Sequence, residues 1–274
     1  MDEVMTLAKA KIFDNPLAKK LSEILNEVGA TLLFLKDVFR VAARNPLNTK
    51  LIAEQIVKVS QQSFATTALA GFFVGAIMTV QFTLQVKEFG ALGYLGGLAT
   101  SATIREVGPL LIAFMLSGKV GAFTSAELGT MKVTEQIDAI RCLGANPILE
   151  IILPRFFGIV ISSFFLLTIG LFMSIFGGLL LGVVFSGINP DEYLRHIPTI
   201  VSSASIISGV VKCFVFALVL ASICTYKGYS TTGGAKGVGR AVVSTAVATM
   251  VCIVIADWFT SFIGDVVVFL FIGD

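Results

Sequence analysis

Five apolar runs, each long enough to cross a bilayer, constrain the fold of this chain more than any other feature of its sequence. They lie near Ser63–Val86, Leu98–Leu116, Ile151–Phe185, Thr199–Thr225 and Ala241–Phe271. A membrane-spanning helix needs about 20 predominantly apolar residues, and backbone in hydrocarbon must satisfy its own hydrogen bonds. The runs therefore predict an all-α membrane protein with about five transmembrane helices. The third run fits one long helix or a break at Gly177-Gly178, and the sequence leaves both open.

The composition agrees with a membrane protein and gives little room for other classes. Of 274 residues, 14% are charged and 55% hydrophobic, whereas about a quarter of a soluble domain is charged. The first 60 residues are polar and helical in pattern, so no cleavable signal peptide is expected. The four cysteines show no paired spacing, and no metal site, catalytic group or nucleic-acid partner is expected.

The distribution of Lys and Arg predicts the orientation. Sixteen of the 20 basic residues lie before residue 60, in 119–155 or in 227–240, and only Lys87 and Arg195 fall in the opposite loops. Cytoplasmic loops carry the excess of positive charge. We therefore expect a cytoplasmic N-terminus and an outer C-terminus.

Residues 1–62 are expected to form an N-terminal arm and residues 63–274 the transmembrane domain. Within the arm, apolar residues from Leu21 to Ala42 recur at helical spacing, with Lys and Glu opposite. This pattern favours a helix lying in the cytoplasmic headgroup region, since basic residues flank its apolar face. An ordinary amphipathic helix packed on the protein is the alternative. Asn45-Pro46 is expected to end this helix.

Four ionisable residues lie inside the predicted spans: Arg105, Glu106, Lys212 and Asp257. An ionised side chain at mid-bilayer costs at least roughly 2.5–3.5 kcal/mol, so such groups pair with one another or face a wet cavity. All four fall at middle to outer depth, which indicates a cavity that opens outward. Basic groups there could meet an anionic headgroup. Ion pairs that only hold helices together, and a proton relay, are the alternatives.

An amphipathic segment between the second and third runs predicts a cytoplasmic helix at about residues 124–144. Thr124 and Glu127 have capping-box spacing for its start, and Gly144 and Pro147 would end it. Its expected apolar stripe is Val133, Ile137, Ile140 and Leu143, with Lys132, Glu135, Asp138 and Arg141 on the polar side. Either a soluble partner docks there or the helix is a solvated connector.

Pairs of glycines four residues apart allow helices to approach closely. They occur at Gly71 and Gly75, at Gly93 and Gly97, and at Gly178 and Gly182. Packing within one chain and dimerisation both remain open. The glycine-rich segment Lys227–Arg240 lacks the order of a phosphate-binding loop and is expected to be a tight cytoplasmic turn.

Several short motifs together resemble the MlaE-type permeases, the membrane subunits of MCE-linked ABC systems that move phospholipids between bacterial membranes. They are Arg105-Glu106-Val107-Gly108-Pro109, Gly118-Lys119-Val120-Gly121-Ala122, AELGTMKVTEQIDAI, Asn146-Pro147, Pro154-Arg155 and KGYSTTGGAKGVGRA. Their order and spread cover most of the chain.

The resemblance implies a homodimer of five-span subunits in the bacterial inner membrane, each with an interfacial N-terminal helix. Two ATPase subunits would bind ATP on the cytoplasmic face, since this chain has no nucleotide site of its own, and a hexameric MCE-domain protein would sit outside. The residues implied for ATPase coupling are Glu127, Lys132, Glu135, Asp138 and Arg141. Those implied for the phospholipid cavity are Arg105, Glu106, Lys212 and Asp257.

Two other functions fit parts of the sequence. A proton-coupled secondary transporter would use Glu106 and Asp257 as carriers, but no inverted repeat is apparent and five spans divide poorly into two. A membrane-embedded enzyme would need a nucleophile, a base or a metal cluster, and the sequence offers none.

Overall fold

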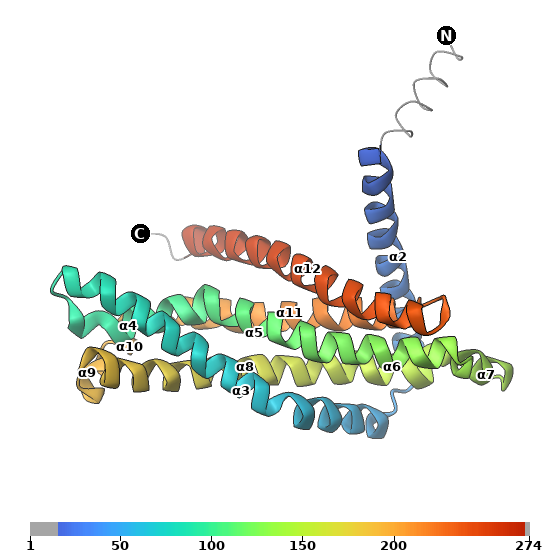
Figure 1. Cartoon of the computed structure of the whole chain (residues 1–274), viewed down its shortest axis with the longest axis horizontal. Coiled ribbons are helices and arrows are strands. Elements are labelled where there is room, and N and C mark those ends of the chain that lie inside the picture. The colour runs from blue at the N-terminus through green and yellow to red at the C-terminus, as the bar shows by residue number, and fades with distance from the viewer. Residues whose placement is uncertain (1–15, 272–274) are drawn as a thin grey trace, which may run out of the picture. The chain divides into compact units, whose positions relative to one another are not determined.

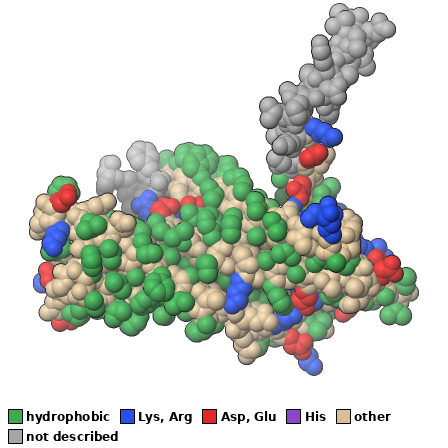
Figure 2. All heavy atoms as spheres, in the orientation of Figure 1, with side chains coloured by type: hydrophobic (Ala, Val, Ile, Leu, Met, Phe, Trp, Pro, Cys, Tyr) green, Lys and Arg blue, Asp and Glu red, His purple; other side chains and the backbone are tan. Residues whose placement is uncertain are grey.

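The computed structural model describes residues 16–271, and that part of the chain is helical without strands. Five helical stretches are long and apolar enough to cross a membrane: Thr49–Glu88, Leu92–Val133, Ile148–Ser186, Ser203–Tyr229 and Gly234–Gly264. The predicted all-α fold with five candidate spans is confirmed. On the face shown in Figure 2, apolar side chains cover much of the bundle, while charged side chains lie mostly toward its two ends.

The helices of the bundle follow one another with short connections (Figure 1). They are α3 (Thr49–Glu88), α4 (Leu95–Ala102), α5 (Gly108–Leu116), α6 (Ala122–Val133), α7 (Gln136–Cys142), α8 (Leu153–Ser186), α9 (Pro190–Arg195), α10 (Ile197–Ile200), α11 (Ser203–Tyr229) and α12 (Gly234–Phe271). A 3₁₀ turn, η1 (Leu92–Tyr94), precedes α4. Three π-helical turns are η2 (Thr103–Val107), η3 (Ser117–Gly121) and η4 (Ile148–Ile152).

Helix α2 (Pro16–Arg44) belongs to a separate compact unit, residues 1–46, and is described by itself. Its amphipathic pattern forms one helix as expected, with Leu25, Leu32 and Leu33 each more than 60% exposed. Residues 1–15 of the expected arm lie outside the described residues. The chain breaks after Arg44 as predicted, but residue 62, the expected end of the arm, falls inside α3.

Helices α3 and α8 run parallel and pack at the closest approach that backbones allow. A Cβ on Gly71 would lie 2.1 Å from the carbonyl oxygen of Gly170, and one on Gly75 would lie 1.7 Å from that of Ser174. No side chain fits at either position. The glycine pair of the first span therefore serves packing within the chain. Helix α8 also passes through Gly177-Gly178 without interruption, which decides for one long third span.

The second span continues well beyond its predicted end at Leu116. Pieces joined by π-helical turns extend it from Leu92 to Val133. The predicted helix start at Thr124 is wrong, because Thr124 is buried within α6 and no chain break precedes it. The break comes at Thr134-Glu135 instead, where Glu135 has a left-handed backbone (φ 61°) and α7 begins.

The fourth span begins at Ser203, four residues later than predicted. Thr199 lies in the short helix α10, after which Val201 is extended. Ser202 then caps α11, its side chain accepting a hydrogen bond from the backbone N–H of Ser205. A serine cap of this kind stabilises a helix start by about 0.5–2 kcal/mol. In Figure 1, α9 and α10 lie at one end of the bundle with α4, and α7 lies at the other end.

Candidate functional site

A buried lysine joins three of the five candidate spans. The ammonium of Lys212 on α11 lies 2.6 Å from Glu106 Oε2 on η2 and 2.8 Å from Asp257 Oδ1 on α12. The Lys212 side chain is fully buried, while those of Glu106 and Asp257 are 43% and 17% exposed. We call these three residues the outer cluster. It contains one cation and two carboxylates.

The backbone around Glu106 explains how the outer cluster forms. The N–H of Gly108 reaches five residues back to the carbonyl of Thr103, which gives a π-helical turn. Pro109 follows and has no N–H to donate, which favours such an irregular turn. On α11, a Cβ at Gly209 would lie 2.7 Å from the carbonyl oxygen of Ile104, so only glycine lets α11 approach η2 this closely.

The sequence analysis missed Ser261, which completes the outer cluster. Its hydroxyl oxygen lies 2.9 Å from the carbonyl oxygen of Asp257 and 3.2 Å from Glu106 Oε2. Its position one helical turn after Asp257 was the available signal. Arg105 shares the π-helical turn with Glu106, and its side chain is exposed. Three of the four predicted cavity residues are thus in contact with one another. The ion pairs considered as an alternative are present, and they tie three spans together.

A second ionic group lies toward the other end of the second helical stretch, Leu92–Val133, which we call the helical rod. Glu127 on α6 accepts hydrogen bonds from Lys58 on α3 at 2.9 Å and from Arg155 on α8 at 3.1 Å. The Lys58 ammonium also lies 5.3 Å from the centre of the Phe123 ring. We call Glu127, Lys58 and Arg155 the inner cluster. Glu127, expected as a coupling residue, here joins α6 to two neighbouring helices.

The remaining four predicted coupling residues lie on or beside α7. Lys132 donates to Asp138 at 2.8 Å, and Arg141 donates to the Tyr229 hydroxyl at 3.0 Å. The hydrogen bond from Lys132 lowers the pKa of Asp138 below its usual value, and the charges of Lys132 and Arg141 act in the same direction. Glu135 is exposed and has no ion pair within the part of the chain that the structure describes.

The predicted apolar stripe of this segment divides into a buried and an exposed part. Ile137 is fully buried against the bundle, whereas the Leu143 side chain at the end of α7 is 85% exposed. Leu143 and Glu135, at the two ends of α7, are therefore both accessible to a partner. Sequence analysis placed Leu143 with the buried positions because its helical spacing fits them.

The outer and inner clusters stand at different levels of the bundle. Glu106 and Glu127 are 21 residues apart along one nearly continuous helical rod, which corresponds to roughly 31 Å at 1.5 Å per residue. The hydrocarbon core of a bilayer is about 30 Å thick. If the inner cluster lies at one membrane surface, the outer cluster lies near the opposite side of the hydrocarbon.

Comparison with known proteins identifies the family. The sequence pattern of the family described as Permease MlaE matches residues 52–263. The chain belongs to this family. A probable ABC transporter permease protein of Rickettsia conorii is 34% identical over 244 residues, covering 89% of this chain and 94% of that protein. A probable ABC transporter permease of Synechocystis is 31% identical, covering 85% and 89%.

A plant relative extends the same similarity to chloroplasts. The chloroplastic protein Trigalactosyldiacylglycerol 1 of Arabidopsis thaliana is 32% identical over 208 residues, covering 76% of this chain and 59% of that protein. The family and its named relatives make this chain an ABC-type permease subunit, a multi-pass membrane protein that works with an ATPase. Two of the motifs that carried the resemblance coincide with the π-helical turns η2 and η3.

Proposed function

We propose that this MlaE-family permease moves phospholipids between the inner and outer membranes of a bacterium, together with an MCE-domain protein. It would act as a homodimer in the inner membrane, N-terminus in the cytoplasm, with two ATPase subunits bound to its cytoplasmic face. The observation that carries the proposal is the outer cluster. A fully buried lysine within a bundle of spanning helices is costly, and cluster residue Glu106 remains 43% exposed.

The surroundings of the outer cluster support a lipid as the transported molecule. Asp257 is followed on α12 by Trp258 and Phe262, whose rings stack at 5.7 Å and whose side chains are 62% and 58% exposed. Exposed aromatic rings suit acyl chains, and Arg105 beside Glu106 suits a phosphate. The Arabidopsis relative also carries the name of a glycerolipid.

The α7 end of the bundle supports coupling to a soluble ATPase. Leu143 and Glu135 are exposed there, while Asp138 and Arg141 are held by hydrogen bonds that keep α7 against the neighbouring helices. A push on the exposed end of α7 would therefore reach α6, which continues directly toward η3 and the outer cluster. ATP-driven closure of the ATPase pair would narrow the cavity and transfer the lipid to or from the MCE channel.

Reconstitution tests the proposal directly. The permease, its ATPase and its MCE partner would be placed in vesicles that contain labelled phospholipid, and ATP-dependent appearance of the label on the MCE protein would be measured. We expect Leu143→Asp combined with Glu135→Lys to abolish ATPase co-purification and transfer. Glu88→Lys, a charge reversal at an exposed position at the far end of α3, is the matched control. ATP-independent transfer, or full transfer by the double variant, would refute the assignment.

A proton-coupled secondary transporter remains a second candidate because two carboxylates share Lys212. The same vesicles separate the two functions. Transport driven by a pH gradient without ATPase or ATP would favour the secondary transporter, and a requirement for ATP at equal pH would exclude it.

A further inference from the structure

Lys119 lies at a different place in the fold from the one that the sequence predicts. It was counted with the cytoplasmic loops, but it lies in η3 inside the second candidate span. Its ammonium donates to the Thr66 hydroxyl on α3 at 3.1 Å. No carboxylate of the described residues lies within ion-pair distance of it. Lys119 is exposed on the candidate span, so its ammonium is accessible to an anionic group from outside the chain.

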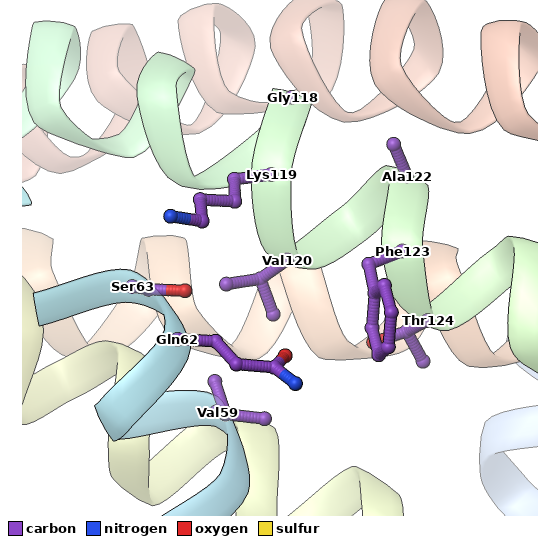
Figure 3. A pocket seen from close by; sticks show the side chains of 9 residues that line it. All are labelled: Val59, Gln62, Ser63, Gly118, Lys119, Val120, Ala122, Phe123 and Thr124. Atoms are coloured by element: carbon purple, nitrogen blue, oxygen red, sulfur yellow. The ribbon is translucent and has the colours of Figure 1, made fainter. Parts of the chain in front are cut away.

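A cavity of about 530 Å³ opens beside Lys119, between α3 and the η3–α6 segment. Figure 3 shows the lysine side chain extending across this gap toward α3, while the Gln62 carboxamide projects into the cavity from the α3 side. Buried Ser63 and Thr124 also line it, and Phe123 forms one wall. The cavity thus offers hydrogen-bond donors beside an ammonium, which is the chemistry that binds phosphate oxygens.

The charge balance of this region favours an anionic ligand. The inner cluster, whose Lys58 lies over the Phe123 wall of the cavity, contains two cations and one carboxylate. Lys119 adds a further positive charge eight residues along the rod from Glu127, or about 12 Å deeper. Its side chain is long enough to reach back toward a headgroup.

An apolar groove of about 490 Å³ continues from the same point. Thr66, the partner of Lys119, lines it at one end, and Leu69, Phe73, Leu111 and Met115 supply apolar walls. The lining is almost wholly hydrocarbon and aromatic, so a hydrated anion would gain nothing there. A molecule with a phosphate and an acyl chain fits both parts.

We propose that Lys119, Thr66 and Gln62 bind the phosphate of a phospholipid, with an acyl chain in the groove between α3 and α5. This second lipid site lies nearer the inner cluster than the outer cluster does. This site rests on the proposed function for the nature of the cargo. It extends that function by adding a second phospholipid-binding site at the other end of the transport pathway. A second copy of the chain covering the groove is the competing occupant.

The test measures phospholipid binding to the full chain in nanodiscs or detergent by native mass spectrometry. Phosphatidylglycerol and diacylglycerol of equal chain length are the two probes. Lys119→Gln should weaken phosphatidylglycerol binding by roughly tenfold to a hundredfold, the value of one hydrogen bond to a charged group, and leave diacylglycerol binding unchanged. Lys119→Arg should retain binding. Lys87→Gln, an exposed lysine at the far end of α3, is the matched control.

Each outcome decides the proposal. Selective loss in Lys119→Gln with retention in Lys119→Arg supports it. Equal phosphatidylglycerol binding by wild type and Lys119→Gln overturns it, as does a change confined to the monomer–dimer ratio, which would assign the groove to a second copy. Because binding needs no ATP or partner, its failure leaves ATP-driven transfer unaffected, and the failure of transfer leaves Lys119-dependent binding intact.

Discussion

The outer and inner clusters each join a glutamate of the second helical stretch to charged residues of two other helices, yet they differ in charge and in burial. The outer cluster has two carboxylates around one lysine that is fully buried. The inner cluster has two cations around one carboxylate, and its members are 12–35% exposed. Water can therefore screen the inner cluster, whereas Lys212 depends on its two partners alone.

This difference separates a partly hydrated structural ion pair from a site whose buried charge depends on its partners. The inner cluster holds α3, α6 and α8 together. Because water can replace a lost partner there, removing one of its charges costs little free energy of unfolding. The outer cluster leaves Glu106 partly exposed while Lys212 is sealed in. A ligand or proton that reached Glu106 would change the balance around a buried charge, which is the property expected of a transport site.

The largest expected effect comes from removing the buried lysine. Lys212→Met leaves Glu106 and Asp257 without their cation, and breaking a buried ion pair costs about 3–5 kcal/mol. We expect a pronounced drop in the midpoint of heat-induced unfolding of the purified protein in detergent.

A triple variant sharpens this test of the outer cluster. Lys212→Met combined with Glu106→Gln and Asp257→Asn removes all three charges and should recover most of the lost stability, since a neutral core needs no ion pair. The triple variant should nevertheless lose bound phospholipid. Full stability of Lys212→Met alone would show that Glu106 and Asp257 do not depend on the lysine.

Gly209→Ala should have the next largest effect, again at the outer cluster. The added methyl group would lie 2.7 Å from the Ile104 carbonyl oxygen, so α11 must move away from η2, at a cost of about 1–3 kcal/mol. We expect lower thermal stability together with a longer Lys212–Glu106 separation and reduced phospholipid retention. Gly239→Ala on α12 has no neighbour within 4 Å of the new methyl group and is the control. Equal thermal stability and equal phospholipid retention in the two variants would contradict the proposed role of close packing at Gly209.

The inner cluster should respond more weakly. Glu127→Gln removes the carboxylate that Lys58 and Arg155 share, but partial exposure limits the loss to about 1 kcal/mol. The midpoint of thermal unfolding, measured at low salt and at about 0.5 M salt, checks this. Screening by salt should reduce the difference in midpoint between variant and wild type. If Glu127→Gln proved as destabilising as Lys212→Met, the contrast between the two clusters would fail.

The sequence predicted those features that depend on hydropathy and composition. Five spans and the proximity of Glu106, Lys212 and Asp257 follow from the cost of polar groups in hydrocarbon. The break at Asn45-Pro46 follows from the steric effect of proline on the residue before it. The helical boundaries depend instead on local contacts. Thr124 had the spacing of a cap but became buried because α6 continues from η3 without a break.

Other features could not be predicted because they arise between helices. Glu127 reads as a surface residue of an amphipathic helix until α3 and α8 bring Lys58 and Arg155 to it. Ser261 becomes part of the outer cluster only because η2 approaches α12. Single-helix patterns hold no information on which neighbour a polar face will meet.

The smallest expected effect concerns pH at α7, beyond the inner cluster. Hydrogen bonding from Lys132 lowers the pKa of Asp138, so its folded pKa lies below the unfolded value of about 3.9. The contact therefore stabilises α7 fully above about pH 4 and is lost as the pH falls through the folded pKa. Hydrogen exchange at α7 amides, corrected for intrinsic rates, should rise between pH 5 and pH 3 in wild type and change less in Asp138→Asn. An equal rise in exchange in wild type and Asp138→Asn would mean that another group controls this end of the bundle. The Lys132–Asp138 contact could then not serve as an exposed counterpart of the inner cluster.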